Sequence, residues 1–229
     1  MNFKNKIFCA LDFSELEQTI QFTNKIKNHI GGIKIGLEFF CKNGPAGVER
    51  LKEFELPIFL DLKLHDIPNT VTKAFKNLIS LSPDYLTVHL NGGKKMIEEL
   101  IKYKKKTKLI GVSMLTSLDH NDLKKSGVMC DEISYVEKLV KIGVSSGIDG
   151  VVSSPKEVKL LRKKFEKLIL VTPGIRLPDD DINDQKRTET PGTAIKNGSS
   201  LLVIGRTITK SINPISSIEK IIQNIENEI

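Results

Sequence analysis

The sequence contains no tryptophan and only three cysteines, which stand far apart at positions 9, 41 and 130. An odd number of cysteines without CxxC spacing is typical neither of a disulfide framework nor of a zinc site. The four histidines are equally scattered along the chain. The cysteines and histidines therefore predict neither covalent cross-links nor a zinc centre.

Long apolar runs are also missing. No apolar stretch approaches the ~20 residues that a membrane-spanning helix needs. The charged segment 1–6 is followed by no apolar run of signal-peptide length, so we expect a cytoplasmic protein without a membrane partner. No Pro-, Gly- or Ser-rich linker divides the 229 residues, and a hydrophobic content of 39% is enough for a sizeable core. This length suits one large domain or two small ones.

Lysine and arginine outnumber aspartate and glutamate by 35 to 28, which gives a net charge of +7. The basic residues cluster at 102–108 and 162–167, where amphipathic helices end and strands begin, and aromatic residues are not interleaved with them. Nucleic-acid surfaces usually combine both kinds of side chain. We therefore expect solvated helix faces and no nucleic-acid partner, while the positive balance favours a small anionic substrate.

The chain reads as a strand followed by a helix, repeated eight times. The expected strands are 7–11, 32–35, 59–65, 84–89, 108–113, 150–152, 168–171 and 201–204. The expected helices are 14–27 with Ser14 as N-cap, 45–54, 68–81, 93–103, 133–146, 155–165, 193–197 and 214–229. Such a repeat predicts an α/β fold, a (β/α)8 TIM barrel that forms a single domain over residues 1–229. An open doubly wound sheet is the alternative, but the GxGxxG and Walker sequences that would support it are missing.

The stretch 59–70 interrupts a buried-looking strand with charge. A period of two places Asp61 and Lys63 on one side, together with Phe59 and His65, and the leucines at 60, 62 and 64 on the other. Asp66 falls outside this alternation, and Pro68 fits the first turn of a helix, so 66–70 is the expected strand-to-helix loop. A solvated edge strand is the alternative reading of these charges. The leucines favour a central strand, whose C-terminal charges mark a candidate active site.

In a barrel, the C-terminal ends of all strands meet at one mouth. The first three strands bring Asp12, Lys34, Asp61 and Lys63 to it, and the last two bring Gly174, Arg176, Gly205 and Arg206. Barrels often bind phosphate after strands seven and eight, through backbone N–H groups and a cation. The polar segment 172–191 is long for a compact domain, which is typical of a functional loop such as a lid.

The ordered motifs resemble one family. They are DLKLHDIPNTV at 61–71, LD at 11–12, KIG at 34–36, LTS at 115–117, PGIR at 173–176, DQKR at 184–187 and GR at 205–206. In this order they resemble the signature of orotidine 5′-phosphate decarboxylase, the last enzyme of UMP synthesis, over essentially the whole chain. Two positions depart from the bacterial pattern. Ser200 stands where Asp is frequent, and Thr207 stands where Pro usually follows the Gly-Arg pair.

The resemblance implies decarboxylation of orotidine 5′-phosphate without a metal or organic cofactor. It implies that Lys63 donates the proton to C6 of the pyrimidine, with Asp61, Asp66 and Lys34 completing an alternating network of carboxylates and ammonium groups. Flanking carboxylates stabilise the charged form of Lys63 that a proton donor requires. Asp61 would face the substrate carboxylate, and repulsion between like charges favours loss of that group.

The resemblance also distributes the substrate contacts. Asp12 and Lys34 would bind the ribose, Thr116 and Ser117 the pyrimidine, and Arg176, Gln185, Gly205 and Arg206 the phosphate. Asp66, Ile67 and Thr70 would enter the active site of the neighbouring subunit, so the implied assembly is a homodimer with shared active sites.

Two other functions compete with this interpretation. Sugar-phosphate decarboxylases and aldolases of the same barrel superfamily share a DxKxxD strand but bind Mg²⁺, typically through an acidic residue on the second strand. This chain has Lys34 there, and a cation would repel the metal. A catalytically inactive barrel that binds a nucleotide or RNA is the second alternative, and the intact Asp-Lys-Asp set disfavours it.

Overall fold

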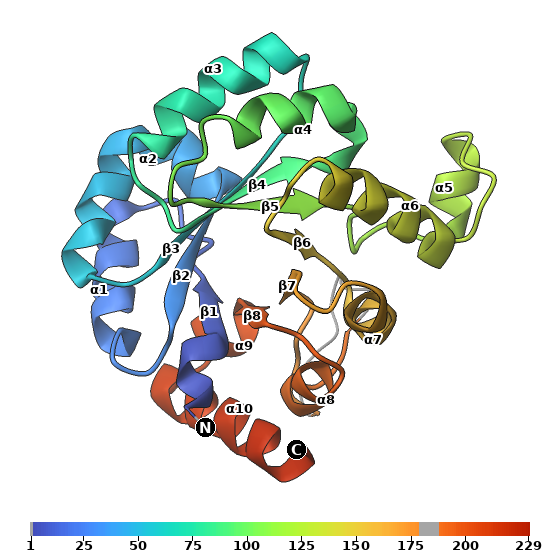
Figure 1. Ribbon diagram of the computed structural model, residues 1–229. Coiled ribbons are helices and arrows are strands. Elements are labelled where there is room, and N and C mark those ends of the chain that lie inside the picture. The colour runs from blue at the N-terminus through green and yellow to red at the C-terminus, as the bar shows by residue number, and fades with distance from the viewer. Residues whose placement is uncertain (1, 179–187) are drawn as a thin grey trace.

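The computed structural model describes residues 2–178 and 188–229. Eight parallel strands form a closed barrel in the order β1 to β8, with β8 pairing back onto β1 (Figure 1). The strands are β1 (Ile7–Ala10), β2 (Gly32–Gly36), β3 (Ile58–Leu64), β4 (Tyr85–His89), β5 (Lys108–Val112), β6 (Gly150–Val152), β7 (Ile169–Thr172) and β8 (Leu201–Ile204). The predicted barrel is confirmed, and the open doubly wound sheet is excluded. β3 lies between β2 and β4, so it is not a solvated edge strand.

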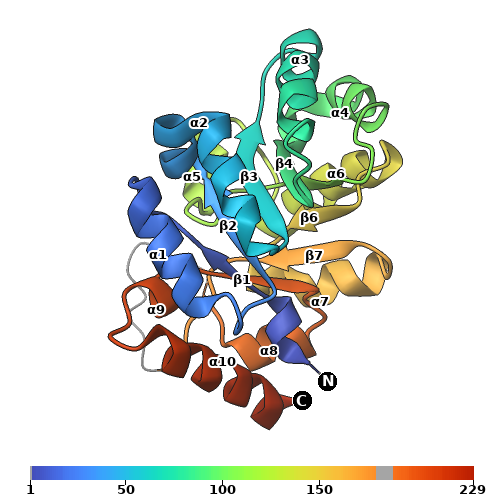
Figure 2. The ribbon, with the colours of Figure 1, turned by 90° about the vertical axis from the view of Figure 1, so that its left-hand side faces the viewer.

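Helices surround the barrel, as two views at right angles show (Figures 1 and 2). They are α1 (Leu16–Ile26), α2 (Leu37–Leu51), α3 (Pro68–Ile79), α4 (Gly93–Ile101), α5 (His120–Lys125), α6 (Glu132–Ser145), α7 (Pro155–Lys164), α8 (Pro191–Lys196), α9 (Arg206–Thr209) and α10 (Pro214–Glu228). Several begin with proline, which fits the first helical turn because its missing N–H would have no partner there. The helix that begins at Pro68 shortens the expected loop 66–70 to three residues, 65–67.

The apolar residues form two layers on opposite sides of the sheet. Phe8, Phe59, Ile110 and Val171 form one buried cluster, and Tyr85 packs against it with its ring 5.5 Å from that of Phe8. The residues that alternate with these, such as Leu60 and Leu62, belong to the larger cluster that includes the helices. The alternation predicted for β3 therefore separates a packed barrel interior from the layer between sheet and helices.

Two expected helix boundaries are wrong, and one helix that was not expected is present. α1 has Glu15 at its N-cap position, and the hydroxyl of Ser14 instead donates a hydrogen bond to Glu38 across to α2. α2 begins at Leu37, well before Pro45. Gly44 adopts a φ of 58° and forms a kink between the two halves of α2, so the expected start at Pro45 is the start of the second half. The unexpected helix is α5. It projects from the barrel in Figure 1, and a capping box between Asp119 and Asp122 starts it.

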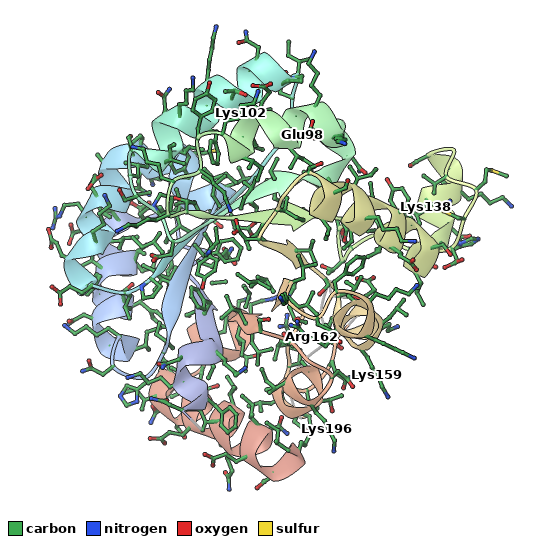
Figure 3. The ribbon with its side chains drawn as sticks, in the orientation of Figure 1. Glu98, Lys102, Lys138, Lys159, Arg162 and Lys196 are labelled. Carbon is green, nitrogen blue, oxygen red and sulfur yellow. The ribbon has the colours of Figure 1, made fainter. Side chains whose placement is uncertain are left out.

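The basic clusters are solvated only in part. In these clusters Lys102 and Lys163 are exposed. Outside them, Lys138, Lys159 and Lys196 are also exposed, on the outer helices α6, α7 and α8 (Figure 3). Arg162 differs from the expectation, because its guanidinium donates to the carbonyl oxygen of Gly198 and to the hydroxyl of Ser200. Burial lowers the pKa of this guanidinium. Arg162 therefore ties α7 to the segment that precedes β8.

Within the described ranges, no helix combines the length and the apolar composition that crossing a bilayer requires.

Candidate active site

Asp61 and Lys63 form an ion pair at the C-terminal end of β3. The Nζ atom of Lys63 lies 2.8 Å from Oδ2 of Asp61, and the two side chains are 31% and 16% exposed. The two residues therefore leave the strand in the same direction, as the alternation predicted. Such a pair is only partly open to water, so its mutual attraction is screened less than that of a surface pair.

The backbone at Lys63 is not a regular strand. β3 and β4 pair in register up to Leu60 and Leu86, and pairing resumes only at Leu64 and Val88, which leaves extra residues on β3. Lys63 has a φ of 48°, in the left-handed region that costs a non-glycine residue roughly 1–2 kcal/mol. β3 ends at Leu64, so His65 lies beyond the regular strand. Strained backbone of this kind is often found at functional sites.

A second ion pair lies at the ends of β1 and β2. The Nζ atom of Lys34 is 2.7 Å from Oδ1 of Asp12. Gly36 makes room for it, because a Cβ atom there would lie only 3.0 Å from the Lys34 Nζ. A Cβ atom on Gly205, at the end of β8, would lie in ordinary contact with Oδ2 of Asp12 at 3.8 Å. The pair therefore occupies the space between the ends of β2 and β8.

A cavity of about 190 Å³ opens beside the Asp61–Lys63 pair. Its polar lining includes Asp61, Lys63 and Thr116. Its apolar walls include Phe59, Val112, Met114, Val152, Val171 and Val203. The cavity thus reaches into the barrel interior, where Asp61 and Lys63 face apolar side chains. Ser117, which was predicted beside Thr116, is exposed and does not line this cavity.

The predicted phosphate residues follow β7 and β8. Arg176 is 9% exposed, and its backbone N–H donates to the carbonyl oxygen of Glu189, whose N–H donates to Gly174. Gly174 has a φ of 73°, which glycine adopts without strain. Gly205 precedes α9, and Arg206 is the first residue of that helix. Both arginines thus stand on the side of the mouth opposite β3 and β4.

The predicted partner-facing residues point outward. Asp66, Ile67 and Thr70 are exposed, and the Ile67 side chain is 65% exposed. The carboxylate of Asp66 accepts a hydrogen bond from the N–H of Ile67, and among the described residues it forms no ion pair with Lys63. Gln185 and the other residues of 179–187, within the expected lid, lie outside the described residues.

Sequence reasoning missed two residues of the site, Thr87 and His89. Thr87 is fully buried, and its hydroxyl contacts both Asp61 and Lys63. The His89 ring packs against the His65 ring with centroids 5.2 Å apart. Burial lowers the pKa of His89, and the nearby His65 and Lys63 lower it further. The strand alternation that selected Asp61 would also have found both residues, because Tyr85, Thr87 and His89 share one face of β4.

The described residues offer few ligands for a metal ion. In residues 2–178 and 188–229, no group of three or more His, Cys, Asp and Glu side chains is arranged to hold one. At the mouth, Lys34 and Lys63 are each paired with a carboxylate, those of Asp12 and Asp61.

Comparison with known proteins identifies the family. Residues 5–221 match the model of the "Orotidine 5'-phosphate decarboxylase / HUMPS family". The orotidine 5′-phosphate decarboxylase of Sphingopyxis alaskensis is 46% identical over 91% of this chain and 93% of its own length, and that of a Culex-associated Wolbachia pipientis is 43% identical over 96% and 99%. The crystal structure of the Lactobacillus acidophilus enzyme of the same name has a TM-score of 0.82 and 33% identity, covering 96% of this chain and 98% of that one. The resemblance predicted from the ordered motifs is confirmed, and the chain belongs to the orotidine 5′-phosphate decarboxylase / HUMPS family of enzymes.

Proposed function

We propose that this protein is a cytoplasmic homodimeric carboxy-lyase that converts orotidine 5′-phosphate to UMP and CO2 without a metal or cofactor. The observation that carries the proposal is the Asp61–Lys63 ion pair, 2.8 Å long, beside a small cavity with apolar walls. Relatives of 40–46% identity that bear the name of this activity add support.

The chemistry follows from the charges at this cavity. The bond between C6 and the carboxylate breaks, its electron pair stays on C6, and CO2 leaves as a neutral molecule. Lys63 stabilises the developing negative charge and then gives C6 a proton from Nζ. Preorganised charge of this kind is worth most where water is excluded, and a substrate that filled the cavity between Lys63 and the apolar walls would displace water from it.

The carboxylate of the substrate is placed near Asp61 in this proposal. Like charges at close range favour a reaction that removes one of them. The apolar walls formed by Val112, Val152 and Val171 act in the same direction, since they solvate neutral CO2 better than a carboxylate. A cavity of about 190 Å³ suits the pyrimidine end of a nucleotide, so the ribose and phosphate would lie outside it, nearer to Asp12 and Arg206.

The phosphate is the part of the substrate that Arg176 and Arg206 would bind. Gly205 allows close approach of the backbone there, and Gln185 joins this set by resemblance to the family. Binding energy from a remote group can be used to hold the reacting carbon in place, which raises the rate of the chemical step.

Asp66, Ile67 and Thr70 belong to the most distinctive motif of the chain, yet they are exposed. The proposed homodimer accounts for this, because the three residues would contact the active site of a second copy. Ile67 is 65% exposed, and a partner that covered it would remove apolar surface from water. A carboxylate outside its own site would complete the network around the Lys63 of a second copy.

One assay tests the proposed reaction. The absorbance of orotidine 5′-phosphate is followed as it becomes UMP, in the presence of EDTA. We expect full turnover with the chelator. Activity that EDTA abolishes and Mg²⁺ restores would show a metal-dependent reaction of the aldolase-like kind, and no turnover in either condition would overturn the assignment of substrate.

A further inference from the structure

Thr87 is a polar residue in the middle of the apolar strand β4, and it is fully buried. Its hydroxyl oxygen accepts a hydrogen bond from the backbone N–H of Lys63 at 2.8 Å. The same hydroxyl donates to Oδ1 of Asp61 at 3.1 Å. The Thr87 hydroxyl therefore donates to one residue of the central ion pair, Asp61, and accepts from the other, Lys63.

These contacts close a ring. Thr87 holds one oxygen of the Asp61 carboxylate, the other oxygen accepts from the Lys63 Nζ at 2.8 Å, and the backbone of Lys63 returns to Thr87. The Thr87 hydroxyl oxygen thus holds both the plane of the Asp61 carboxylate and the backbone from which the Lys63 side chain starts. Neither group could rotate without breaking a hydrogen bond to this buried hydroxyl.

The irregular backbone of β3 explains why such a support is needed. Between Leu60 and Leu64 the strand leaves its register with β4, and Lys63 takes up a positive φ. A strained conformation of this kind persists only where the surroundings determine it. The Thr87 hydroxyl provides an acceptor for the N–H of Lys63 within this irregular stretch.

We propose that Thr87 is a positioning residue, whose hydroxyl fixes the Lys63 ammonium and the Asp61 carboxylate in the geometry that decarboxylation requires. The inference rests on the proposed function, since it assigns Thr87 a share in that reaction. Thr87 acts through the two charged residues and needs no contact with substrate. Errors of about 1 Å in the placement of reacting groups can cost an enzyme roughly 100-fold in rate.

Three substitutions test this inference. Thr87→Val keeps the branched shape and removes the hydroxyl, whereas Thr87→Ser keeps the hydroxyl and removes a methyl group. Thr107→Val is the matched control, because Thr107 is also buried and its hydroxyl donates to the carbonyl oxygen of Pro83 at 2.8 Å, just before β5 at the opposite end of the barrel. Each variant is assayed for kcat, KM and thermal stability.

We expect Thr87→Val to lower kcat on orotidine 5′-phosphate about 10- to 100-fold, with KM within about threefold of wild type. Thr87→Ser should stay within about threefold of the wild-type kcat, and Thr107→Val should keep its kcat while losing stability. A wild-type kcat in Thr87→Val, or equal losses in the serine and valine variants, would overturn the positioning role.

A second measurement does not depend on turnover. Hydrogen exchange of the Lys63 N–H, followed by NMR, should be slow in wild type and at least about tenfold faster in Thr87→Val than in Thr107→Val. Fast exchange in the wild-type protein would overturn the inference even if Thr87→Val did not fold. If wild type failed to release CO2 from orotidine 5′-phosphate, the proposed function would fall, and the Lys63 exchange rate would still decide whether Thr87 holds this residue.

Discussion

The Nζ atom of Lys34 lies 2.7 Å from Oδ1 of Asp12, but the two side chains are buried very unequally, with 9% and 55% exposed. The ammonium has left water almost completely, while its carboxylate partner remains at the surface of the mouth. Lys34 therefore depends on Asp12 more than Asp12 depends on Lys34, because an unpaired buried charge is costly.

This asymmetry predicts the effect of Asp12→Asn. The variant should unfold with a free energy about 1–2 kcal/mol lower than wild type, since the amide cannot balance the buried ammonium. Urea denaturation measures the difference. Glu53→Gln is the control, because its pair with Arg50 is exposed and should contribute less than about 0.5 kcal/mol. Equal effects of the two substitutions would show that Lys34 does not rely on Asp12.

Lys63→Ala should remove nearly all kcat and leave UMP binding measurable, because the ammonium acts on charge that develops in the transition state. Turnover and calorimetric binding of UMP are the two measurements. Lys102→Ala is a suitable control, since Lys102 pairs with Glu99 on the surface at the end of α4. A Lys63→Ala enzyme that kept more than a few per cent of kcat would not use Lys63 as its proton donor.

Arg206→Ala should impair the use of orotidine 5′-phosphate far more than that of the nucleoside orotidine. The lost contact is to phosphate, which the nucleoside lacks. The measurement is kcat/KM on both substrates. If both fell by the same factor, Arg206 would support the structure of the α9 segment and not the phosphate.

The shared site predicts recovery of activity in mixed dimers. Lys63→Ala and Asp66→Ala homodimers should both be nearly inactive. When the two are dissociated together and reassociated at random, half of the dimers are mixed and each contains one intact site, so about a quarter of all sites should recover. Mixed dimers that are present but inactive would place Asp66 in the site of its own chain.

His89 predicts a loss of stability in acid. Its pKa is lowered from the ordinary value of 6.5, chiefly by burial, so the unfolded chain binds this proton at a higher pH than the folded chain. The stability that neutral His89 gives to the folded state is complete above about pH 6.5, and it declines as the pH falls from there towards the pKa of His89 in the folded protein. Between pH 8 and pH 5, wild type should lose more stability than His89→Gln. Thr107→Val removes no titratable group and supplies the control, so its curve should run parallel to that of wild type.

The barrel and the Asp61–Lys63 pair could be predicted because both follow from local periodicity. Eight strand–helix repeats determine the topology, and an alternation of two determines which side chains share a face of β3. The conformation of Lys63 could not be predicted this way. Its positive φ depends on the pairing with β4, and the residue that accepts its N–H, Thr87, is 24 positions away.

The missed helix boundaries have two different causes. Gly44 and Pro45 do interrupt the helix, because Gly44 has a φ of 58° and Pro45 begins the second half of α2, but the first half from Leu37 was not expected. Ser14 is a good N-cap by composition, but Glu38 of α2 binds its hydroxyl. At Ser14 a contact that is distant in sequence therefore decides between local alternatives.

The closure of the sheet also restricts how copies of this protein can associate. An open sheet presents unpaired N–H and C=O groups to which a foreign strand can add, and such edges promote aggregation. Here β8 completes the ring by pairing with β1, so the eight described strands offer no template for strand addition. Association between copies is therefore left to the side chains of loops and helices, where specificity depends on the identity of individual residues.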